Sequence, residues 1–491
     1  MSPKSGEESP ETQPEPPKSF ESEGQLELEG GTLDYRSIAG WQRLRQGDKE
    51  KEHAEIFFTY YRADGENRPL TFVFNGGPGA ASAYLHMGAM GPVRVATNAD
   101  GTLPPAPARL VPNRDSWLAF TDLVFVDPVG TGLSRTLESK DDKAPDDTFY
   151  WNVENDLDSL CDFFEGFLSS HKRWSSPVFV AGESYGGYRA ARMVRRVQEK
   201  AGIGLCGAFV ISPALEWEFL LGGRYAPMAF ATLVPSMAAT AHAHGLAGSG
   251  HSLPEFLEGV EHFVLGELVG AMVGASAEGR ALPDGTANKL AGYTGLSAEL
   301  WRKHTGRIDM MRYVRELFRD QGKIVGLYDG AVTAEDPWPL SDSFEGLDPT
   351  LGGQFRLFAT GANAHLRDAL GLDDPRRYHL INFDVNHKWR IATKEGYGIA
   401  LPAGASKDLA AGMAANPDTR VVISHGYCDL VTPYFQSEYL VGLMRHDTPV
   451  AARIERVHYA GGHMFYTRED SRRAFTAMAR KVVQEAVVGD R

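Results

Sequence analysis

One pattern runs along most of this chain and limits what it can fold into. Short apolar runs rich in β-branched residues alternate with segments of helical periodicity. The runs are Leu70–Phe74, Leu123–Val126, Val178–Ala181, Ala208–Ile211, Arg420–Ser424 and Arg453–His458. Runs without polar alternation are typical of parallel strands that are buried on both faces. Because helical patterns lie between them, we predict an α/β fold with a mostly parallel central sheet.

The pattern breaks off between residues 216 and 380. Ala-rich segments such as Ala226–Gly245 dominate there, and Arg307–Asp320 repeats apolar residues at a spacing of three and four. That spacing is typical of one face of a helix. We therefore expect a mostly helical insertion over 216–380, between the two halves of one core, 31–215 and 381–491.

The first residues differ in composition from the rest. Residues 1–24 carry six Glu and five Pro and hold no apolar stretch of signal-peptide length. Such a segment cannot bury enough surface to order itself, so we predict a disordered tail over residues 1–30.

Charge and cysteine content narrow the function classes. Fifty basic against 64 acidic residues give a net charge of −14, which argues against nucleic acid and anionic membranes as partners. No run reaches the length of a membrane span, and three Cys are too few for a disulfide framework. We expect a cytoplasmic protein that does not associate with membranes.

The segment Gly182-Glu183-Ser184-Tyr185-Gly186 carries the clearest chemical signal. It fits the pattern G-x-S-x-G, in which a turn between a strand and a helix is so tight that small residues must flank the serine. A predicted strand precedes it, and the helix-like Arg189–Val197 follows. This context predicts that Ser184 projects above the sheet edge as a nucleophile.

Such a serine needs a base and a carboxylate that orients the base, in the chain order Ser, Asp, His. Asp429 follows a predicted strand, and His463 follows the last strand on a Gly-rich loop. Both would lie at the carboxyl edge of the sheet, where ligands bind in open α/β folds. His425 and His458 are rival bases, but each lies in or beside a predicted strand.

A Gly-rich loop, Asn75-Gly76-Gly77-Pro78-Gly79, follows an early strand. Glycines let backbone N–H groups approach a ligand closely, as an oxyanion hole requires. The hole would pair an N–H of this loop with that of Tyr185, the residue after the nucleophile.

Five motifs in chain order resemble the serine carboxypeptidases, peptidase family S10. They are Asn75–Gly79, Asp127–Gly132, Gly182–Gly187, the segment around Asp429, and Gly462–Met464. The likeness covers roughly residues 35–485. The insertion is similar to bacterial members of the family around Gly222–Tyr225, Gly292–Leu296 and Gly322–Asp329.

The resemblance implies an α/β-hydrolase fold with a helical cap, and it implies roles for individual residues. Ser184 would be the nucleophile, His463 the general base and acid, and Asp429 its orienter. The oxyanion donors would be the backbone N–H groups of Gly77 and Tyr185. No metal and no organic cofactor is implied.

The substrate's terminal carboxylate would be bound by Asn75 and Glu183. A glutamate can hold a carboxylate only if one of the two is protonated, so the family binds best at acidic pH. Many members carry a second Glu that shares a proton with the first, but here Ala89 stands at that position. We therefore expect the pKa of Glu183 to be raised less. The segment Met464-Phe465-Tyr466 also departs from the family pattern, a change we expect to be minor.

We predict a serine carboxypeptidase that releases C-terminal residues from peptides with a free C-terminus. An esterase or peptide amidase that ignores the terminal carboxylate remains open because of Ala89. An acyltransferase on the same three residues is a further alternative, and so is a binding protein without catalysis. Side-chain preference and oligomeric state cannot be predicted from these motifs.

Overall fold

The computed structural model of the chain describes residues 19–28, 30–46, 51–137, 147–220, 225–341, 346, 348–394, 400–402 and 404–488. A sheet forms the centre of this described part. Its strands are β1 (Phe20–Leu28), β2 (Gly31–Gln46), β3 (Lys51–Ala63), β4 (Leu70–Phe74), β7 (Asp122–Val126), β8 (Arg135–Thr136), β9 (Val178–Glu183), β10 (Leu205–Ile211), β15 (Arg420–Gly426) and β16 (Ile454–Tyr459). The order is β1-β2-β3-β7-β4-β9-β10-β15-β16, and β8 pairs with β3.

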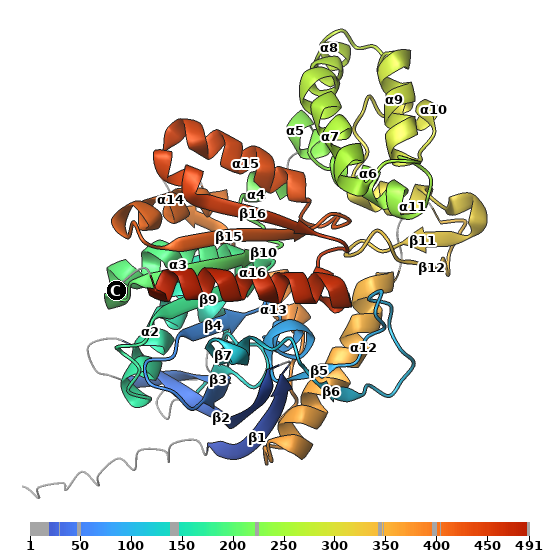
Figure 1. Cartoon of the computed structure of the whole chain (residues 1–491). Coiled ribbons are helices and arrows are strands. Elements are labelled where there is room, and N and C mark those ends of the chain that lie inside the picture. Colours follow the sequence, from blue (N-terminus) through green and yellow to red (C-terminus); the bar gives the residue numbers. More distant parts are fainter. Residues whose placement is uncertain are drawn as a thin grey trace, which may run out of the picture.

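From β7 to β16 the neighbouring strands are parallel (Figure 1). Each of the six apolar runs predicted as strands overlaps one of these strands. The prediction of an α/β fold with a mostly parallel sheet is therefore confirmed.

Part of the segment predicted as a disordered tail, residues 1–30, is a strand of the sheet. Residues 1–18 lie outside the described residues, but β1 pairs antiparallel with β2, with Phe20 opposite Ala39. Glu21, Glu23 and Glu27 alternate with inward-facing residues along β1 and are exposed. An acidic composition is compatible with this strand because the period of two leaves the charges in water.

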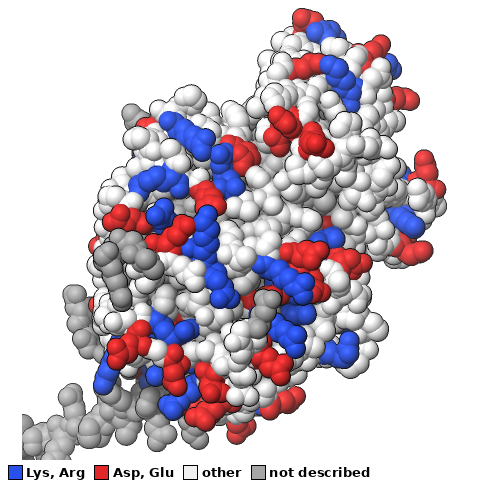
Figure 2. All heavy atoms as spheres, in the orientation of Figure 1, with Lys and Arg blue, Asp and Glu red and all other residues white. Residues whose placement is uncertain are grey.

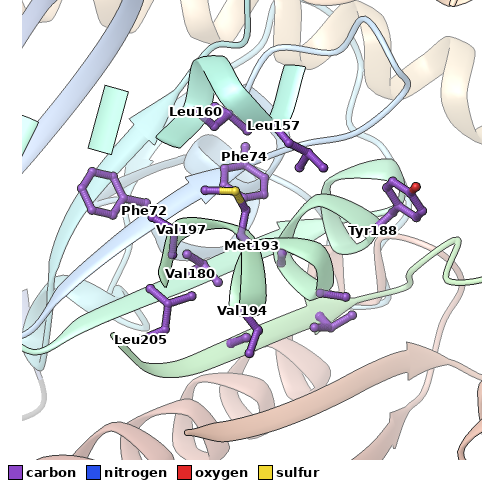
Figure 3. Packing of buried hydrophobic residues seen from close by; sticks show 14 of the residues in the cluster. Phe72, Phe74, Leu157, Leu160, Val180, Tyr188, Met193, Val194, Val197 and Leu205 are labelled. Atoms are coloured by element: carbon purple, nitrogen blue, oxygen red, sulfur yellow. The ribbon is translucent and has the colours of Figure 1, made fainter. Parts of the chain in front are cut away.

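Helices cover both faces of the sheet. They are α1 (Ala83–Leu85), α2 (Val153–Ser170), α3 (Tyr185–Ala201), α4 (Trp217–Leu220), α13 (Phe383–Lys388), α14 (Ser406–Ala415), α15 (Tyr434–Asp447) and α16 (Glu469–Val488). On one face, Leu157 of α2 and Met193 of α3 pack over Phe74 of β4 and Val180 of β9 (Figure 3). On the other face, Phe475 of α16 belongs to a second apolar cluster. Each such buried side chain contributes about 1.5–3 kcal/mol to folding.

The helices of the insertion form a lobe beside the sheet (Figure 1). They are α5 (Pro227–Ala231), α6 (Val234–Ala243), α7 (Leu253–Phe263), α8 (Val269–Ala277), α9 (Asp284–Thr294), α10 (Ala298–Lys303) and α11 (Met310–Glu316). The lobe has an apolar cluster of its own, which includes Met237, Val260 and Leu290. Tyr434 and Phe435 of α15 join this cluster, so the lobe packs on the core through α15.

A hairpin of β11 (Lys323–Val325) and β12 (Thr333–Glu335) still packs with the lobe, because Val325 lies in the lobe's apolar cluster. The helix that follows, α12 (Pro349–Asn363), packs elsewhere. Leu357 and Phe358 of α12 lie in the same apolar cluster as Val73 of the central sheet. The segment predicted as one insertion over 216–380 is thus divided between the lobe and the core.

Two short antiparallel pairs complete the described part, β5 (Val93–Val95) with β6 (Leu110–Pro112) and β13 (Ala392–Lys394) with β14 (Ala400–Pro402). Acidic and basic side chains are interleaved on the face shown in Figure 2. Among the described residues, no helix combines the length and the apolarity that crossing a membrane requires.

Candidate active site

Ser184 stands between the end of β9 and the start of α3, with φ 62° and ψ −123°. A non-glycine residue in this region is strained by about 1–3 kcal/mol and persists only where its surroundings hold it. Here the Ser184 N–H donates to the Ile211 carbonyl at 2.9 Å, and the Gly187 N–H donates to the Ser184 carbonyl at 2.9 Å. Ser184 is partly exposed between buried neighbours, as a nucleophile that projects from the sheet edge must be.

Close backbone packing explains the glycines around this serine. A Cβ at Gly182 would lie 1.9 Å from the carbonyl oxygen of Gly186. A Cβ at Gly76 would lie 2.5 Å from the backbone nitrogen of Tyr185. The Gly-rich loop after β4 therefore runs directly against the first turn of α3.

The two backbone donors predicted for the oxyanion hole lie on these touching segments. Tyr185 is the first residue of α3, where an N–H has no acceptor within the helix. Within the described ranges, no backbone hydrogen bond outside the helices and strands uses the N–H of Gly77 or Tyr185. Both groups therefore remain available to a ligand.

His463 and Asp429 form a buried pair. Nδ1 of His463 lies 2.7 Å from Oδ2 of Asp429. Because a carboxylate can only accept, Nδ1 carries the proton and donates it. In neutral His463, Nε2 then has the free lone pair that a general base needs.

Asp429 is held by further donors. The backbone N–H groups of Val431 and Thr432 donate to its Oδ1 at 2.9 and 3.0 Å. The Thr432 hydroxyl lies 2.7 Å from Asp429 Oδ2 and 3.1 Å from His463 Nδ1. Ser212, after β10, donates from its hydroxyl to the His463 carbonyl at 2.8 Å. These contacts fix the carboxylate and the imidazole relative to each other.

The third member of the predicted set lies close by but is not hydrogen-bonded to the base. Among the described residues, no hydrogen bond joins the Ser184 hydroxyl to His463. Nε2 of His463 lies 3.8 Å from Oε1 of Glu183, the residue before the nucleophile. Catalytic hydrogen bonds are often longer without substrate and tighten in the reacting complex.

Glu183 and Asn75, predicted to bind a carboxylate, contact each other. Asn75 Nδ2 donates to Glu183 Oε2 at 2.8 Å, and Asn75 Oδ1 accepts from the Leu85 N–H at 3.0 Å. The hydroxyl of Tyr466 also donates to Glu183 Oε2. All these side chains are buried. One carboxyl oxygen thus has two donors, and the other faces His463.

The pKa values of the two central groups are both raised. Burial raises the pKa of Glu183, although His463 and the hydrogen bonds from Tyr466 and Asn75 oppose the shift. For His463, burial lowers the pKa, but the Asp429 carboxylate and Glu183 outweigh it and leave the pKa above 6.5. His463 is therefore mostly neutral at Nε2 only when the pH lies above the ordinary pKa of histidine.

The rival histidines make other contacts. Nε2 of His425 lies 2.8 Å from the Ser437 hydroxyl, and Nε2 of His458 lies 3.3 Å from Oε1 of Glu438. Neither of these contacts involves Asp429.

Several supporting residues were not predicted. Arg189 is buried in α3, where it pairs with Asp156 at 2.7 Å and donates to the Asn75 carbonyl at 2.7 Å. Tyr328 of the insertion accepts the His463 N–H at its carbonyl at 2.6 Å. The departure at Met464-Phe465-Tyr466, expected to be minor, includes Tyr466, whose hydroxyl donates to Glu183.

No group of three or more His, Cys, Asp or Glu suited to a metal ion occurs within the described ranges. Proton transfer from a serine hydroxyl to an imidazole that a carboxylate orients needs no metal.

Comparison with known proteins is consistent with these features. The sequence model of the family "Serine carboxypeptidase" (Peptidase S10) matches residues 31–215. Serine carboxypeptidase-like 5 of Arabidopsis thaliana is 29% identical over 174 residues, which are 34% of this chain and 36% of that protein. Pheromone-processing carboxypeptidase KEX1 of Vanderwaltozyma polyspora is 29% identical over 150 residues, 29% of this chain and 18% of the other. The chain thus matches about a third or less of the length of these relatives. They come from a plant and a fungus and lend no support to a bacterial-type member.

A solved structure shares the fold over nearly the whole chain. It is that of KEX1ΔP, a prohormone-processing carboxypeptidase from Saccharomyces cerevisiae, with a TM-score of 0.51 and 16% identity. The alignment covers 92% of this chain and 91% of the other. The segment that the family model matches, residues 31–215, includes the nucleophile turn at Ser184.

Proposed function

We propose that the protein is a serine carboxypeptidase that removes residues from the C-termini of peptides through an acyl-enzyme on Ser184. The observation that carries the proposal is the buried Asn75–Glu183 contact beside the His463–Asp429 pair. It sets groups suited to a terminal carboxylate next to groups suited to acyl transfer.

The proposed reaction has two halves. Ser184 Oγ attacks the last peptide carbonyl while His463 Nε2 takes its proton and passes it to the leaving amine. Water, deprotonated by His463, then releases the acyl group. The N–H groups of Gly77 and Tyr185 stabilise the oxyanion in both halves.

Recognition of the substrate would depend on the protonation of Glu183. Its raised pKa favours a neutral carboxyl, which can donate a hydrogen bond to the substrate carboxylate. Once Glu183 ionises, two negative charges oppose each other. KM for free-acid peptides should therefore increase with pH, whereas His463 requires a higher pH to act as a base.

The test is the cleavage of one N-blocked peptide with a free or an amidated C-terminus, followed by mass spectrometry between pH 4 and 8. Ser184→Ala serves as the blank. Stepwise loss of terminal residues from the free acid alone is the expected result. A fluorophosphonate probe should label Ser184 and should react far more slowly in His463→Ala. Equal cleavage of both peptides would contradict the carboxypeptidase.

An esterase or peptide amidase is the second candidate, because Ala89 leaves Glu183 without a second carboxyl. Release of ammonia alone from the amidated peptide would favour it. Turnover of ester donors only when an alcohol acceptor is present would indicate an acyltransferase. The likeness of the insertion to bacterial members remains a prediction from three short sequence segments.

A further inference from the structure

We propose that Tyr466 replaces the missing second carboxyl of the substrate-carboxylate site. Its hydroxyl fixes one oxygen of Glu183 and thereby turns the other oxygen towards the terminal carboxylate of the peptide. This inference rests on the proposed function and names a positioning residue for it.

The hydrogen bonds around Glu183 carry the argument. Tyr466 and Asn75 both donate to Oε2, which uses both acceptor directions of that oxygen. Within the described residues, no hydrogen bond is made by Oε1, which lies 3.8 Å from Nε2 of His463. The free oxygen is therefore the one beside the acid–base pair, where the end of a substrate must lie.

The space around residue 89 links the two departures from the family pattern. Ala89 is buried in the turn His86–Met90. A Cβ at the neighbouring Gly88 would lie 2.9 Å from Cε2 of the Tyr466 ring. The ring thus packs against the segment that carries Ala89. Where Ala89 supplies no carboxyl, the Tyr466 hydroxyl reaches Glu183 from another segment.

A phenol and a carboxyl differ in charge. The groups that face Glu183 are His463, Asp429, Tyr466, Tyr84 and Tyr328. Burial holds the pKa values of the three tyrosines above the ordinary value of 10, so they stay neutral. Among Glu183 and these three tyrosines, only Glu183 then becomes negatively charged, so Glu183 and Tyr466 do not share a proton as two carboxyls do.

The neutral site has a definite arrangement of protons. Oε2 of Glu183 acts as a carbonyl oxygen that accepts from Tyr466 and Asn75. The proton is bound to Oε1 and is donated to the substrate carboxylate. Because the bond from Tyr466 lowers the pKa of Glu183, its removal should raise that pKa further.

Tyr466→Phe tests the inference, with Tyr459→Phe as its matched control. Tyr459 is another buried tyrosine, and its hydroxyl has no partner in the described part of the chain. KM and kcat are measured from pH 5 to 9 on an N-blocked dipeptide with a free C-terminus and on an N-blocked amino-acid ethyl ester. Thermal unfolding of both variants checks that the fold is intact.

For Tyr466→Phe we expect KM of the dipeptide to rise about tenfold at pH 5–6, the size of one lost hydrogen bond to a polar group. The pH at which this KM begins to climb should move upwards. KM of the ester should change less than twofold, and Tyr459→Phe should leave both substrates unaffected.

A second pair of variants separates orientation from titration. In Glu183→Gln the amide keeps an oxygen for Tyr466 and donates to the substrate, so KM of the dipeptide should lose its pH dependence. When Tyr466→Phe is added to Glu183→Gln, KM of the dipeptide should rise but should remain independent of pH.

Three outcomes would overturn the inference. An unchanged KM of the dipeptide in Tyr466→Phe would remove the role of the hydroxyl. Equal losses on dipeptide and ester would indicate a merely structural residue. A wild-type enzyme that cleaves the ester and never the dipeptide would overturn the proposed function as well, so the two failures are distinguishable.

Discussion

At the scale of single residues, Asp127 shows what burial does to a carboxyl that the proposed chemistry does not use. Its Oδ1 accepts the Ser82 N–H at 2.8 Å, but its Oδ2 has no partner among the described residues. A Cβ at Gly132 would lie 1.7 Å from that oxygen, so the chain leaves no room for a larger residue there. Burial raises the pKa of Asp127 to about 6.

The raised pKa predicts how stability depends on pH. The folded pKa of Asp127 lies above the ordinary value of 3.8, so its contribution to stability is complete below about pH 4 and is lost as the pH rises through 6. Asp127→Asn imitates the protonated form. Its free energy of unfolding should therefore exceed that of the wild type by an amount that grows with pH, up to ~3 kcal/mol at pH 8.

Urea unfolding between pH 4.5 and 8 measures this difference. Asp418→Asn is the control for the same substitution at an exposed position. A constant difference for Asp127→Asn would show that the carboxyl is ionised in the folded protein throughout.

The sequence could predict some site residues and not others for a physical reason. Ser184 and His463 stand in short motifs whose Gly-rich backbone largely determines where the side chain points. The contact of Tyr466 with Glu183 joins residues 283 positions apart. It depends on how two separate loops pack, and neither local spacing nor composition records that packing.

At the scale of elements, two neighbouring strands bring the candidate oxyanion donors together. β4 pairs parallel with β9, with Phe74 opposite Gly182, so their carboxyl ends lie side by side. The loop after β4 must then run against the turn after β9. Gly76 lies at this contact, directly against the backbone of Tyr185 in α3.

Gly76→Ala should therefore damage the oxyanion hole. Its Cβ would lie 2.5 Å from the Tyr185 nitrogen and 2.7 Å from the Glu183 carbonyl oxygen, so the loop must move away. We expect kcat to fall by roughly 10²–10³, the usual effect of one lost oxyanion donor. The measurement is kcat on the free-acid peptide, with circular dichroism to verify the fold.

Gly204→Ala is the matched control, because the nearest atom to its Cβ would be 3.5 Å away. It should keep full activity. Full activity in Gly76→Ala would mean that the loop after β4 supplies no donor.

The sequence predicts the parallel strands of the sheet well and the outer elements poorly. Strands buried on both faces read as continuous apolar runs, whereas β1 alternates exposed glutamates with partly buried residues. Likewise α12 has the pattern of a helix and lies within the predicted insertion. That pattern does not predict that α12 packs in the same apolar cluster as the central sheet.

At the scale of the whole molecule, the insertion contacts the loops that carry His463 and Asp429. Tyr328, between β11 and β12, accepts the His463 N–H, and Asp329 pairs with Arg468 at 2.7 Å. The Gly330 N–H donates to the carbonyl of Cys428, the residue before Asp429, at 2.9 Å. We therefore expect the packing of the insertion and the geometry of the His463–Asp429 pair to be coupled.

Gly462→Ala tests this coupling. Its Cβ would lie 2.1 Å from the Tyr328 carbonyl oxygen and 2.4 Å from the Asp329 Cα, so the histidine loop and the insertion must separate. A displacement of about 1 Å at a catalytic group can reduce the rate about 10²-fold. We expect a loss of that size in kcat and in the rate of fluorophosphonate labelling.

The control for this last variant is Gly442→Ala, in the helix α15, where a Cβ would meet nothing within 4 Å. It should keep its activity and gain about 0.5–1 kcal/mol of stability, because alanine is the better helix former. If Gly462→Ala labels as fast as the wild type, the insertion and the acid–base pair are independent. A slow Gly462→Ala that still unfolds in one cooperative transition would instead show that the contact between the insertion and the His463 loop affects the rate in an intact fold.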